Sequence, residues 1–348
     1  MFIKDSSCIS PQITFDNRFF EQKVIVYKGN KYISEEPNYK ELIPFKLLRR
    51  MGRATRIGIG AGISLLQRNT EVDGIIIGTA NGGLEDSIKF LNQIIKYEEG
   101  KLTPTNFIQS TPNSISGNLA IMSQNNKYNI THVHKGLAFE NALLDAFLLF
   151  EEKKVNSVLV GNIEELSDYN YNIDFLSDAF KSEEITSDKL LNSQTKGTVC
   201  GEGAAMFILD AKESVNSVQI VDVEQMVYPT VDDIQEKIIY FIERNNLLLS
   251  DIDGLVLGLN GDNRTDYYYH TTIENIFPNI SVFSYKNLVG EYPSSSAFAT
   301  WLASQILQKK NVPEDVKYKS VNSDIKTILV YNHFEGTQHG LILLKSTE

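Results

Sequence analysis

Side chains that commonly perform covalent or acid–base chemistry are few in this chain. It contains two cysteines, Cys8 and Cys200, and five histidines. His132 and His134 alternate with Val133, so that both imidazoles would lie on one face of a strand. A metal site would need further Cys, Asp or Glu side chains at ligand spacing, which this segment lacks. We therefore expect buried or interfacial histidines satisfied by hydrogen bonds, and no bound metal.

The most specific chemical signal is a glutamate between two glycines. Segment 197–209 reads GTVCGEGAAMFIL, and Glu202 stands there at the entrance to an apolar strand. A carboxylate buried at such a place needs several hydrogen-bond donors, and Gly201 and Gly203 allow the backbone to come close. We interpret Glu202 as a structural acid and the neighbouring Cys200 as a core thiol.

Common nucleotide and hydrolase motifs give no competing assignment. Gly58, Gly60 and Gly62 form a GxGxG string, but the string lies in a segment with helical periodicity and follows no strand. Small residues on one helix face more often permit close packing, and we adopt that interpretation. The sequence contains no GxxxxGKS/T, HExxH or GxSxG pattern. We therefore predict no cofactor.

These residues must be positioned by elements that alternate between strand and helix. Apolar segments that end on glycine predict strands at 73–78, 155–161 and 253–258. Apolar residues at three- and four-residue spacing predict helices at 51–66, 136–152, 234–245 and 294–308. This alternation is typical of an α/β fold.

The two halves of the chain repeat one pattern. In each half a helix is followed by a short linker with an aspartate and then by an apolar strand that closes on glycine. The repeat predicts an internal duplication with its seam near residues 210–217. We therefore divide the chain into an N-terminal half, 1–212, and a C-terminal half, 213–348.

Length and composition fit a folded, enzyme-like protein. The chain has 348 residues, of which 42% are hydrophobic and 22% charged, and its formal net charge is −11. An acidic balance without basic runs disfavours nucleic acid as a partner. Two cysteines cannot form a disulfide framework, the first residues lack a signal pattern, and no apolar run approaches a membrane span. We expect a soluble, cytoplasmic protein.

The glutamate string resembles the G-x-V-x-G-E-G-A signature of the β-ketoacyl synthases, condensing enzymes of the thiolase superfamily. Four other segments resemble this family in the right order: 78–85 (GTANGGLE), 109–121, 160–165 (VGNIEE) and the lysine segment 285–290 (YKNLVG). The resemblance covers nearly the whole chain. It implies a thiolase-like, five-layered αβαβα fold built from two duplicated halves.

The same resemblance shows where this chain departs from active ketosynthases. The family's catalytic cysteine position falls on Gly136, and its two catalytic histidine positions fall on Asn260 and Glu291. Lys286 of the lysine segment is retained, and Asp266 is an inherited scaffold charge. The glycine-rich gating loop is shortened to residues 332–337. The resemblance leaves two candidates to line a gate or acyl tunnel, Phe334 and Tyr268.

Ketosynthase chemistry needs a thiolate to hold the acyl chain and two imidazoles to stabilise the carbanion formed on decarboxylation. Asparagine cannot exchange a proton at neutral pH, and an ionised glutamate would repel an enolate. The resemblance therefore implies a non-catalytic subunit of the chain-length-factor type, as in aryl-polyene or flexirubin-type pathways. Its partners would be an active ketosynthase, in a heterodimer formed along segment 130–134, and an acyl carrier protein.

Two other hypotheses remain open. The chain could be an active acyltransferase or thioester hydrolase that uses Glu291 as a base, supported by Lys135 or Lys286. It could also be a homodimeric acyl-binding or scaffold protein.

Overall fold

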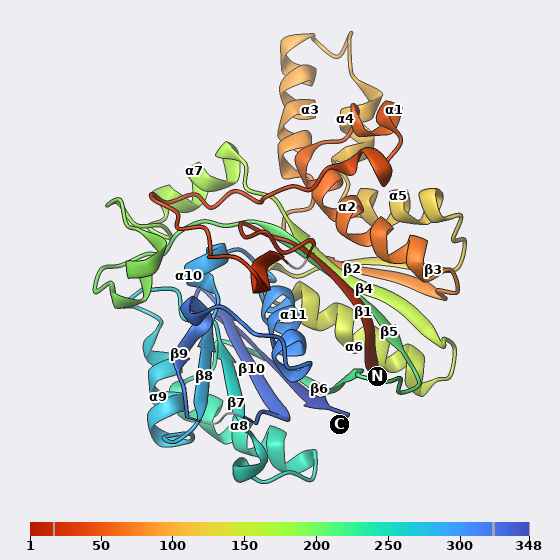
Figure 1. Ribbon diagram of the computed structural model, residues 1–348. Helices are drawn as coiled ribbons and strands as arrows, with labels where there is room; N and C mark the ends of the chain where they lie inside the picture. The colour runs from red at the N-terminus through yellow and green to blue at the C-terminus, as the bar shows by residue number, and fades with distance from the viewer. Residues whose placement is uncertain (17, 322–323, 348) are drawn as a thin grey trace.

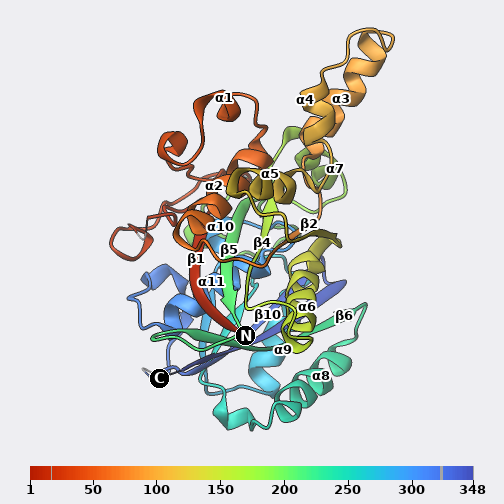
Figure 2. The same ribbon diagram turned by 90° about the vertical axis from the view of Figure 1, so that its right-hand side faces the viewer.

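The computed structural model describes residues 1–16, 18–321 and 324–347, and over these residues helices and sheets alternate in five layers (Figures 1 and 2). The strands are β1 (Phe2–Ile9), β2 (Gly74–Thr79), β3 (Tyr128–Val133), β4 (Ser157–Glu164), β5 (Gly203–Asp210), β6 (Val218–Val227), β7 (Gly254–Leu257), β8 (Ser281–Ser284), β9 (Lys317–Lys319), β10 (Thr327–Phe334) and β11 (Gln338–Ser346). Every predicted strand segment overlaps one of them, namely β2, β4 or β7.

The order of the strands repeats between the two halves. The described strands follow the order β3-β2-β4-β5-β1-β6-β11-β10-β7-β8-β9. In the second half, the strands that correspond to β1, β2, β3, β4 and β5 are β6, β7, β8, β10 and β11. With this correspondence, the strand order of the second half is that of the first half in reverse, and β9 is an additional strand at the edge. The halves meet where β1 pairs with β6 over two residues, Phe2 with Gln219 and Ile3 with Val218.

The linker aspartates of the repeated pattern make the same contact in both halves. The Asp73 carboxylate accepts hydrogen bonds from the backbone of Asn156 (2.7 Å) and Ser157 (3.3 Å), where β4 begins. The Asp253 carboxylate accepts from Lys326 and Thr327, both at 2.9 Å, where β10 begins. Because β4 and β10 are matched strands, these contacts support the duplication predicted from the sequence.

Helices form the central layer and both outer layers. The central helices are α6 (Ala138–Glu151) and α11 (Ser296–Leu307), which share one apolar core with both halves of the sheet. One outer face is covered by α2 (Arg53–Arg68) and α5 (Ser114–Ser123), and the other by α8 (Val231–Arg244) and α9 (Tyr267–Asn275). Helix α11 is buried along its whole length, as a central position requires.

The remaining helices lie near the ends of strands. They are α1 (Phe45–Leu48), α3 (Leu84–Lys96), α4 (Pro104–Gln109), α7 (Asp168–Leu176) and α10 (Lys286–Val289). Helices α3 and α4 form a hairpin that projects from the body beside α7 (Figures 1 and 2). Among the described residues, no helix has the length and apolar character that crossing a membrane requires.

One helix boundary differs from its prediction in an informative way. The helix expected from residue 136 begins only at Ala138, after a 3-10 turn over Lys135–Leu137. Lys135 takes a positive φ of 46°, which few residues other than glycine adopt without strain. The chain therefore turns sharply between β3 and α6, at the position where the resemblance expects a catalytic cysteine.

Candidate functional site

A cavity of about 440 Å³ lies where several strand ends and loops meet. It is lined by the end of β4, by α7 and by loops that follow β7, α10 and β10. The sequence-predicted positions Asn260, Glu291 and Phe334 all line it. Polar side chains in a concave pocket, several with displaced pKa values, are the usual features of a binding or active site.

Glu291 is held on one of its two carboxylate oxygens. Oε2 accepts a hydrogen bond from Lys286 Nζ at 2.6 Å and another from Asn260 Nδ2 at 2.8 Å. Lys286 is fully buried, and its ammonium also donates to the carbonyl of His333 at 3.1 Å. Burial raises the pKa of Glu291 above its ordinary value, although the two donors oppose that rise. The structure thus joins Asn260, Glu291 and Lys286 in one buried polar cluster.

Asp266 fixes the loop that carries Asn260. Its carboxylate accepts hydrogen bonds from the backbone N–H groups of Asn260 (3.0 Å) and Gly261 (2.8 Å). Burial raises its pKa to about 6, and the two N–H donors lower it. Thr198 Oγ1 donates to the Asn260 carbonyl at 2.7 Å from the other side. Asp266 therefore acts as a positioning residue for the loop, as its interpretation as a scaffold charge implies.

The turn at Gly136 is filled by Phe334. Gly136 is buried, and its N–H donates to Gln338 Oε1 at 2.9 Å. A Cβ atom at this position would collide with Phe334 Cβ and would lie 2.9 Å from Phe334 Cγ. Cβ and Cγ of Phe334 therefore occupy the space that a side chain at position 136 would need. Phe334 lines the cavity, whereas Gly136 does not.

Glu202 holds three segments together beneath the cavity. Its carboxylate accepts hydrogen bonds from the backbone of Ser34 and of Leu166, each at 2.8 Å, and from Arg53 Nε at 2.9 Å. It is fully buried, so these donors replace the water that it loses. At Gly201 a Cβ would collide with the backbone of the lysine segment. The glycine–glutamate signature therefore packs and joins segments of the chain in this structure.

The other predicted residues do not belong to the polar cluster of Asn260, Glu291 and Lys286. Cys200 is a buried thiol that lines the cavity, and burial raises its pKa well above the ordinary range. Tyr268 is not among the residues that line this cavity. Its ring packs edge-on against His333 and His339, with centroids 5.7 and 4.9 Å away. Gly203 starts β5 and packs against the backbone of Ile9.

His132 and His134 make separate contacts with α6. His132 Nε2 lies 3.0 Å from Asp145, and His134 Nδ1 lies 2.7 Å from Asn141 Nδ2. His134 follows the end of β3, so the strand pattern covers only the first of the two. Within the described part of the chain, no group of three or more His, Cys, Asp or Glu side chains is arranged to hold a metal ion.

Sequence reasoning missed five carboxyl side chains that line the cavity: Glu164, Glu165, Asp174, Asp262 and Glu335. Burial raises the pKa of Glu164 to about 8 and that of Glu165 to about 7, although backbone N–H groups oppose both shifts. Two adjacent glutamates directly after an apolar, fully buried strand are a signal that could have identified this pair. Asp174 lies within the helix α7 and Glu335 in the turn after β10, and neither follows a buried strand directly as a pair of acids, so they give no such signal.

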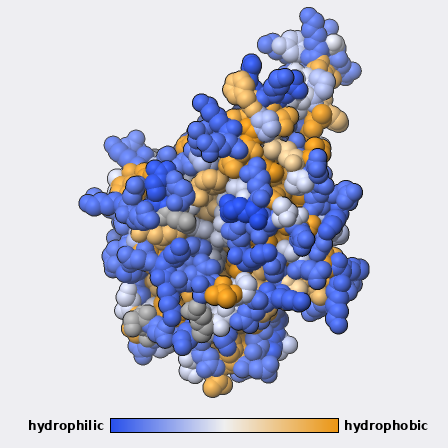
Figure 3. Space-filling model, turned by 45° about the vertical axis from the view of Figure 1, so that its right-hand side comes forward, coloured by the Kyte–Doolittle hydropathy of each residue, from blue (hydrophilic) through white to orange (hydrophobic). Residues whose placement is uncertain are grey.

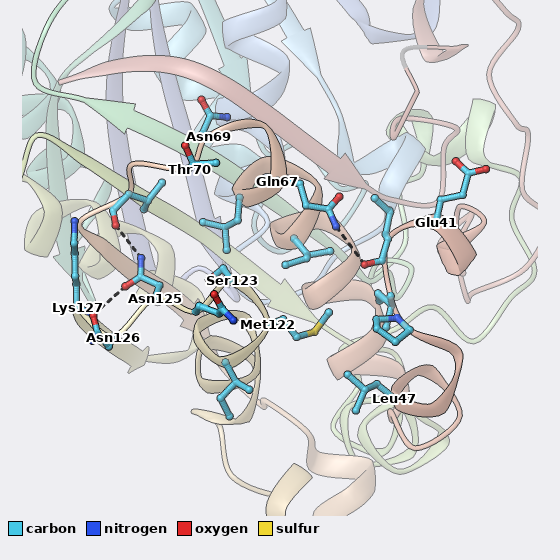
Figure 4. A pocket seen from close by; sticks show the side chains of 18 of the residues that line it. Glu41, Leu47, Gln67, Asn69, Thr70, Met122, Ser123, Asn125, Asn126 and Lys127 are labelled. Atoms are coloured by element: carbon cyan, nitrogen blue, oxygen red, sulfur yellow. Dashed lines mark hydrogen bonds between the residues drawn. The ribbon is translucent and has the colours of Figure 1, made fainter.

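A larger hollow of about 760 Å³ lies on the outer face, between the segment around α1 and the C-terminal ends of α2 and α5 (Figure 4). The sequence-predicted site residues do not line it. Two side-chain amides that line this hollow donate hydrogen bonds to the backbone of the chain. Asn125 donates to the Val72 carbonyl at 2.8 Å and Gln67 to the Leu42 carbonyl at 3.5 Å. We therefore take the smaller cavity as the candidate site.

Comparison with known proteins agrees with this architecture. Residues 27–180 match the family model described as the N-terminal domain of beta-ketoacyl synthase. A beta-ketoacyl synthase from Burkholderia phymatum superposes with a TM-score of 0.80 and 14% identity, covering 100% of this chain and 99% of its own. A search of curated protein sequences gave no match.

Two matching structures contain a chain length factor. The ishigamide ketosynthase/chain length factor superposes with a TM-score of 0.79 at 13% identity, over 100% of this chain and 99% of its own. The ketosynthase of Xenorhabdus doucetiae, solved in complex with its chain length factor, superposes with a TM-score of 0.77 at 14% identity, over 99% of this chain and 98% of its own. The chain therefore has the thiolase-like fold of ketosynthases, as predicted.

Proposed function

We propose that this chain is a non-catalytic ketosynthase-like subunit of the chain-length-factor type, which pairs with an active β-ketoacyl synthase. The observation that carries the proposal is the cluster at the candidate site. An asparagine and a lysine-bound glutamate stand where the resemblance expects two imidazoles, and Glu291 Oε2 is 2.6 Å from Lys286 Nζ. The Asn260 amide group already donates to Glu291, and an ionised glutamate repels the carbanion of a decarboxylated malonyl unit.

The cysteine position supports the same proposal. A thiol introduced at residue 136 would collide with Phe334, so more than one substitution separates this chain from an active ketosynthase. Cys200 does not replace the missing nucleophile, because burial, together with nearby Asp174 and Glu202, raises the pKa of its thiol and disfavours the thiolate.

Two surface features suit a partner subunit. Strand β3 is an outer strand of the sheet, and the exposed row of N–H and C=O groups on such a strand can pair with a strand of a second chain. The α3–α4 hairpin also carries large exposed apolar side chains: Leu91, Ile95, Phe107 and Ile108. Figure 3 shows further apolar surface where this projection joins the body. A ketosynthase protomer that covered both features would bury this surface.

We also propose that the pair acts with an acyl carrier protein in fatty-acid, polyketide or polyene synthesis. The resemblance to subunits of aryl-polyene and flexirubin-type pathways supports a polyene product.

Intact-protein mass spectrometry with malonyl- and acyl-carrier thioesters tests the proposal. The chain should be assayed alone and together with the ketosynthase encoded beside it, and size-exclusion chromatography should follow assembly. We expect a heterodimer in which acylation is confined to the ketosynthase. Condensation of malonyl-carrier by the chain alone would overturn the proposal.

The unpartnered oxygen of Glu291 supports a second candidate function. Glu291 Oε1 has no hydrogen-bond partner among the described residues and belongs to a side chain that lines the cavity. A base of an acyltransferase or thioester hydrolase would need such an oxygen. A stable acyl adduct on this chain, or thioester hydrolysis lost in Glu291→Gln, would favour that function over a chain length factor.

A further inference from the structure

The two helices of the α3–α4 hairpin bury only polar side chains, although the hairpin is attached to a large apolar body (Figures 1 and 2). The one buried residue of α3 is Asp86, and the one buried residue of α4 is Gln109. Among the described residues, no side chain of either helix belongs to an apolar core. Burial of apolar surface is the dominant force that fixes an element in one position. The hairpin therefore lacks the contact that holds the other helices in place.

Hydrogen bonds hold the base of the hairpin instead. Gln109 Oε1 accepts from the Gly52 N–H at 2.5 Å, and Gln109 Nε2 donates to the Arg50 carbonyl. At the start of α3, the Glu85 N–H donates to the Glu165 carboxylate at 3.1 Å. The net contribution of such bonds is small, because water takes over the freed donors and acceptors when they open. These base contacts can therefore release the hairpin at a modest cost in free energy.

The two connections between the hairpin and the body lie side by side. Gly82, just before α3, has a φ of 53°, and a Cβ there would lie 3.0 Å from Pro112 Cα, beyond α4. At Gly83 a Cβ would collide with the carbonyl oxygen of Gln109. Glycines tolerate large changes of φ and ψ, and a few such residues are enough to form a hinge. Because both connections meet at one place, they form a single pivot.

The hairpin itself is held together by contacts between its helices. The rings of Phe90 and Phe107 pack with their centroids 5.3 Å apart. Towards the tip, the Thr103 N–H donates to Gln93 Oε1 at 3.2 Å. Neither contact involves the body of the chain, so both persist when the base contacts open. The hairpin therefore moves as one rigid unit.

We propose that the α3–α4 hairpin pivots about residues 82–83 and 110–112, between its docked position and a released position in which the base contacts of Gln109 and Glu165 are open. Glu165 lines the candidate cavity, so the pivot lies at the edge of that site. The motion would let the exposed apolar face of the hairpin adjust to a second protein. This inference goes beyond the proposed function and does not depend on it, because the motion belongs to the chain alone.

Double electron–electron resonance on the purified full chain measures the position of the hairpin. One nitroxide label at Lys101→Cys, in the loop at the tip, is paired with one at Glu236→Cys on the exposed face of α8. Cys8 and Cys200 are buried, and the chain without introduced cysteines serves as the labelling blank. We expect Gln109→Ala to raise the population at a second, released distance, relative to the docked one, about tenfold over the otherwise identical labelled chain.

Hydrogen exchange read at single residues distinguishes pivoting from unfolding. In Gln109→Ala the Glu85 amide should exchange about tenfold faster, although its acceptor Glu165 is unchanged, because the base opens as a whole. The Phe90 amide, which is bonded within α3, should exchange as in the wild type. Gln93→Ala is the matched control, since it removes a hydrogen bond inside the hairpin and none to the body, and it should change neither the Glu85 amide nor the label distances.

Three results would overturn the proposal. They are one unchanged distance in Gln109→Ala, loss of protection at Phe90 together with Glu85, and an effect of Gln93→Ala equal to that of Gln109→Ala. Far-ultraviolet circular dichroism checks that the variants keep their secondary structure. Because no partner or carrier protein is added, failure of this proposal leaves the proposed subunit function unaffected.

Discussion

Glu164 shows how one buried side chain couples the candidate site to pH. It stands at the end of β4, accepts hydrogen bonds from the N–H of Asn81 (3.3 Å) and the hydroxyl of Ser294 (3.3 Å), and is almost fully buried. Burial raises its pKa to about 8 from an ordinary value of 4.5. The folded chain therefore holds this proton over a pH range in which the unfolded chain has released it.

This shift predicts a pH-dependent stability. A raised carboxyl pKa contributes stability that is complete below pH about 4.5 and is lost as the pH rises through about 8. Glu164→Gln mimics the protonated acid. It should reduce the fall of the unfolding free energy with rising pH by up to about 1.4 kcal/mol per pH unit, and it should make the chain more stable than wild type near pH 8.5. Urea unfolding at pH 5 to 9 measures it, with exposed Glu213→Gln as control. An unchanged slope in Glu164→Gln would contradict the assignment.

Phe334 and Gly136 make a second residue-scale prediction. Gly136→Cys alone should destabilise the chain by about 1–3 kcal/mol, because the new Cβ meets Cβ and Cγ of Phe334. The same substitution in a Phe334→Gly background should cost clearly less, since both of these atoms have been removed. A double-mutant cycle from urea midpoints measures the coupling. Strictly additive costs would show that the Phe334 side chain does not fill this space.

At the scale of elements, the α3–α4 hairpin is the clearest candidate for an interaction surface. Its rings Phe90 and Phe107 pack 5.3 Å apart and hold the two helices together, while Leu91 and Ile95 of α3 are 56% and 78% exposed. An apolar face of this kind on a projecting hairpin has no evident use in a monomer.

Charges on this face should therefore separate folding from assembly. The double variant Leu91→Asp and Ile95→Asp should keep the stability of the chain within about 0.5 kcal/mol but weaken the complex with an active ketosynthase at least about thirtyfold. Val215→Asp, at a position that is 92% exposed in the loop before β6, is the matched control and should assemble normally. Normal assembly of the double variant would exclude the hairpin from the interface.

Elements were more predictable from the sequence than the site was. The strands β2, β4 and β7 are apolar runs closed by glycine, and α11 shows helical spacing, so local pattern alone locates them. The cluster of Asn260, Glu291 and Lys286 was reachable only through resemblance, because its members meet through loops from different strands. That Asp174 and Glu335 line one cavity depends on how α7 and the turn after β10 come together, which periodicity does not encode.

At the scale of the whole molecule, the two halves share a single interior. Helices α6 and α11, one from each half, lie in the same apolar cluster with strands of both halves. We propose that the division at residues 210–217 is an evolutionary seam and not a boundary between independently folding domains. The loop that connects β5 to β6 contains this seam.

This proposal predicts that the halves fold only together. Fragments 1–212 and 213–348 should each be insoluble or molten when expressed alone, because each would expose one side of the central helix layer. Coexpression should yield a soluble 1:1 complex with a native-like near-ultraviolet circular dichroism spectrum. A fragment that unfolds cooperatively on its own would show that a half is an independent domain.

The position of β1 has a consequence for the synthesis of the chain. Its described neighbours in the sheet are β5 and β6, about two hundred residues further along, and the Met1 carbonyl accepts a hydrogen bond from Ile220 N–H at 2.9 Å. During translation β1 must wait, with both edges open, until the residues of β5 and β6 have left the ribosome. An unpaired strand edge is a template for association with other nascent chains. The yield of folded protein should therefore depend on elongation rate and on chaperones that shield β1.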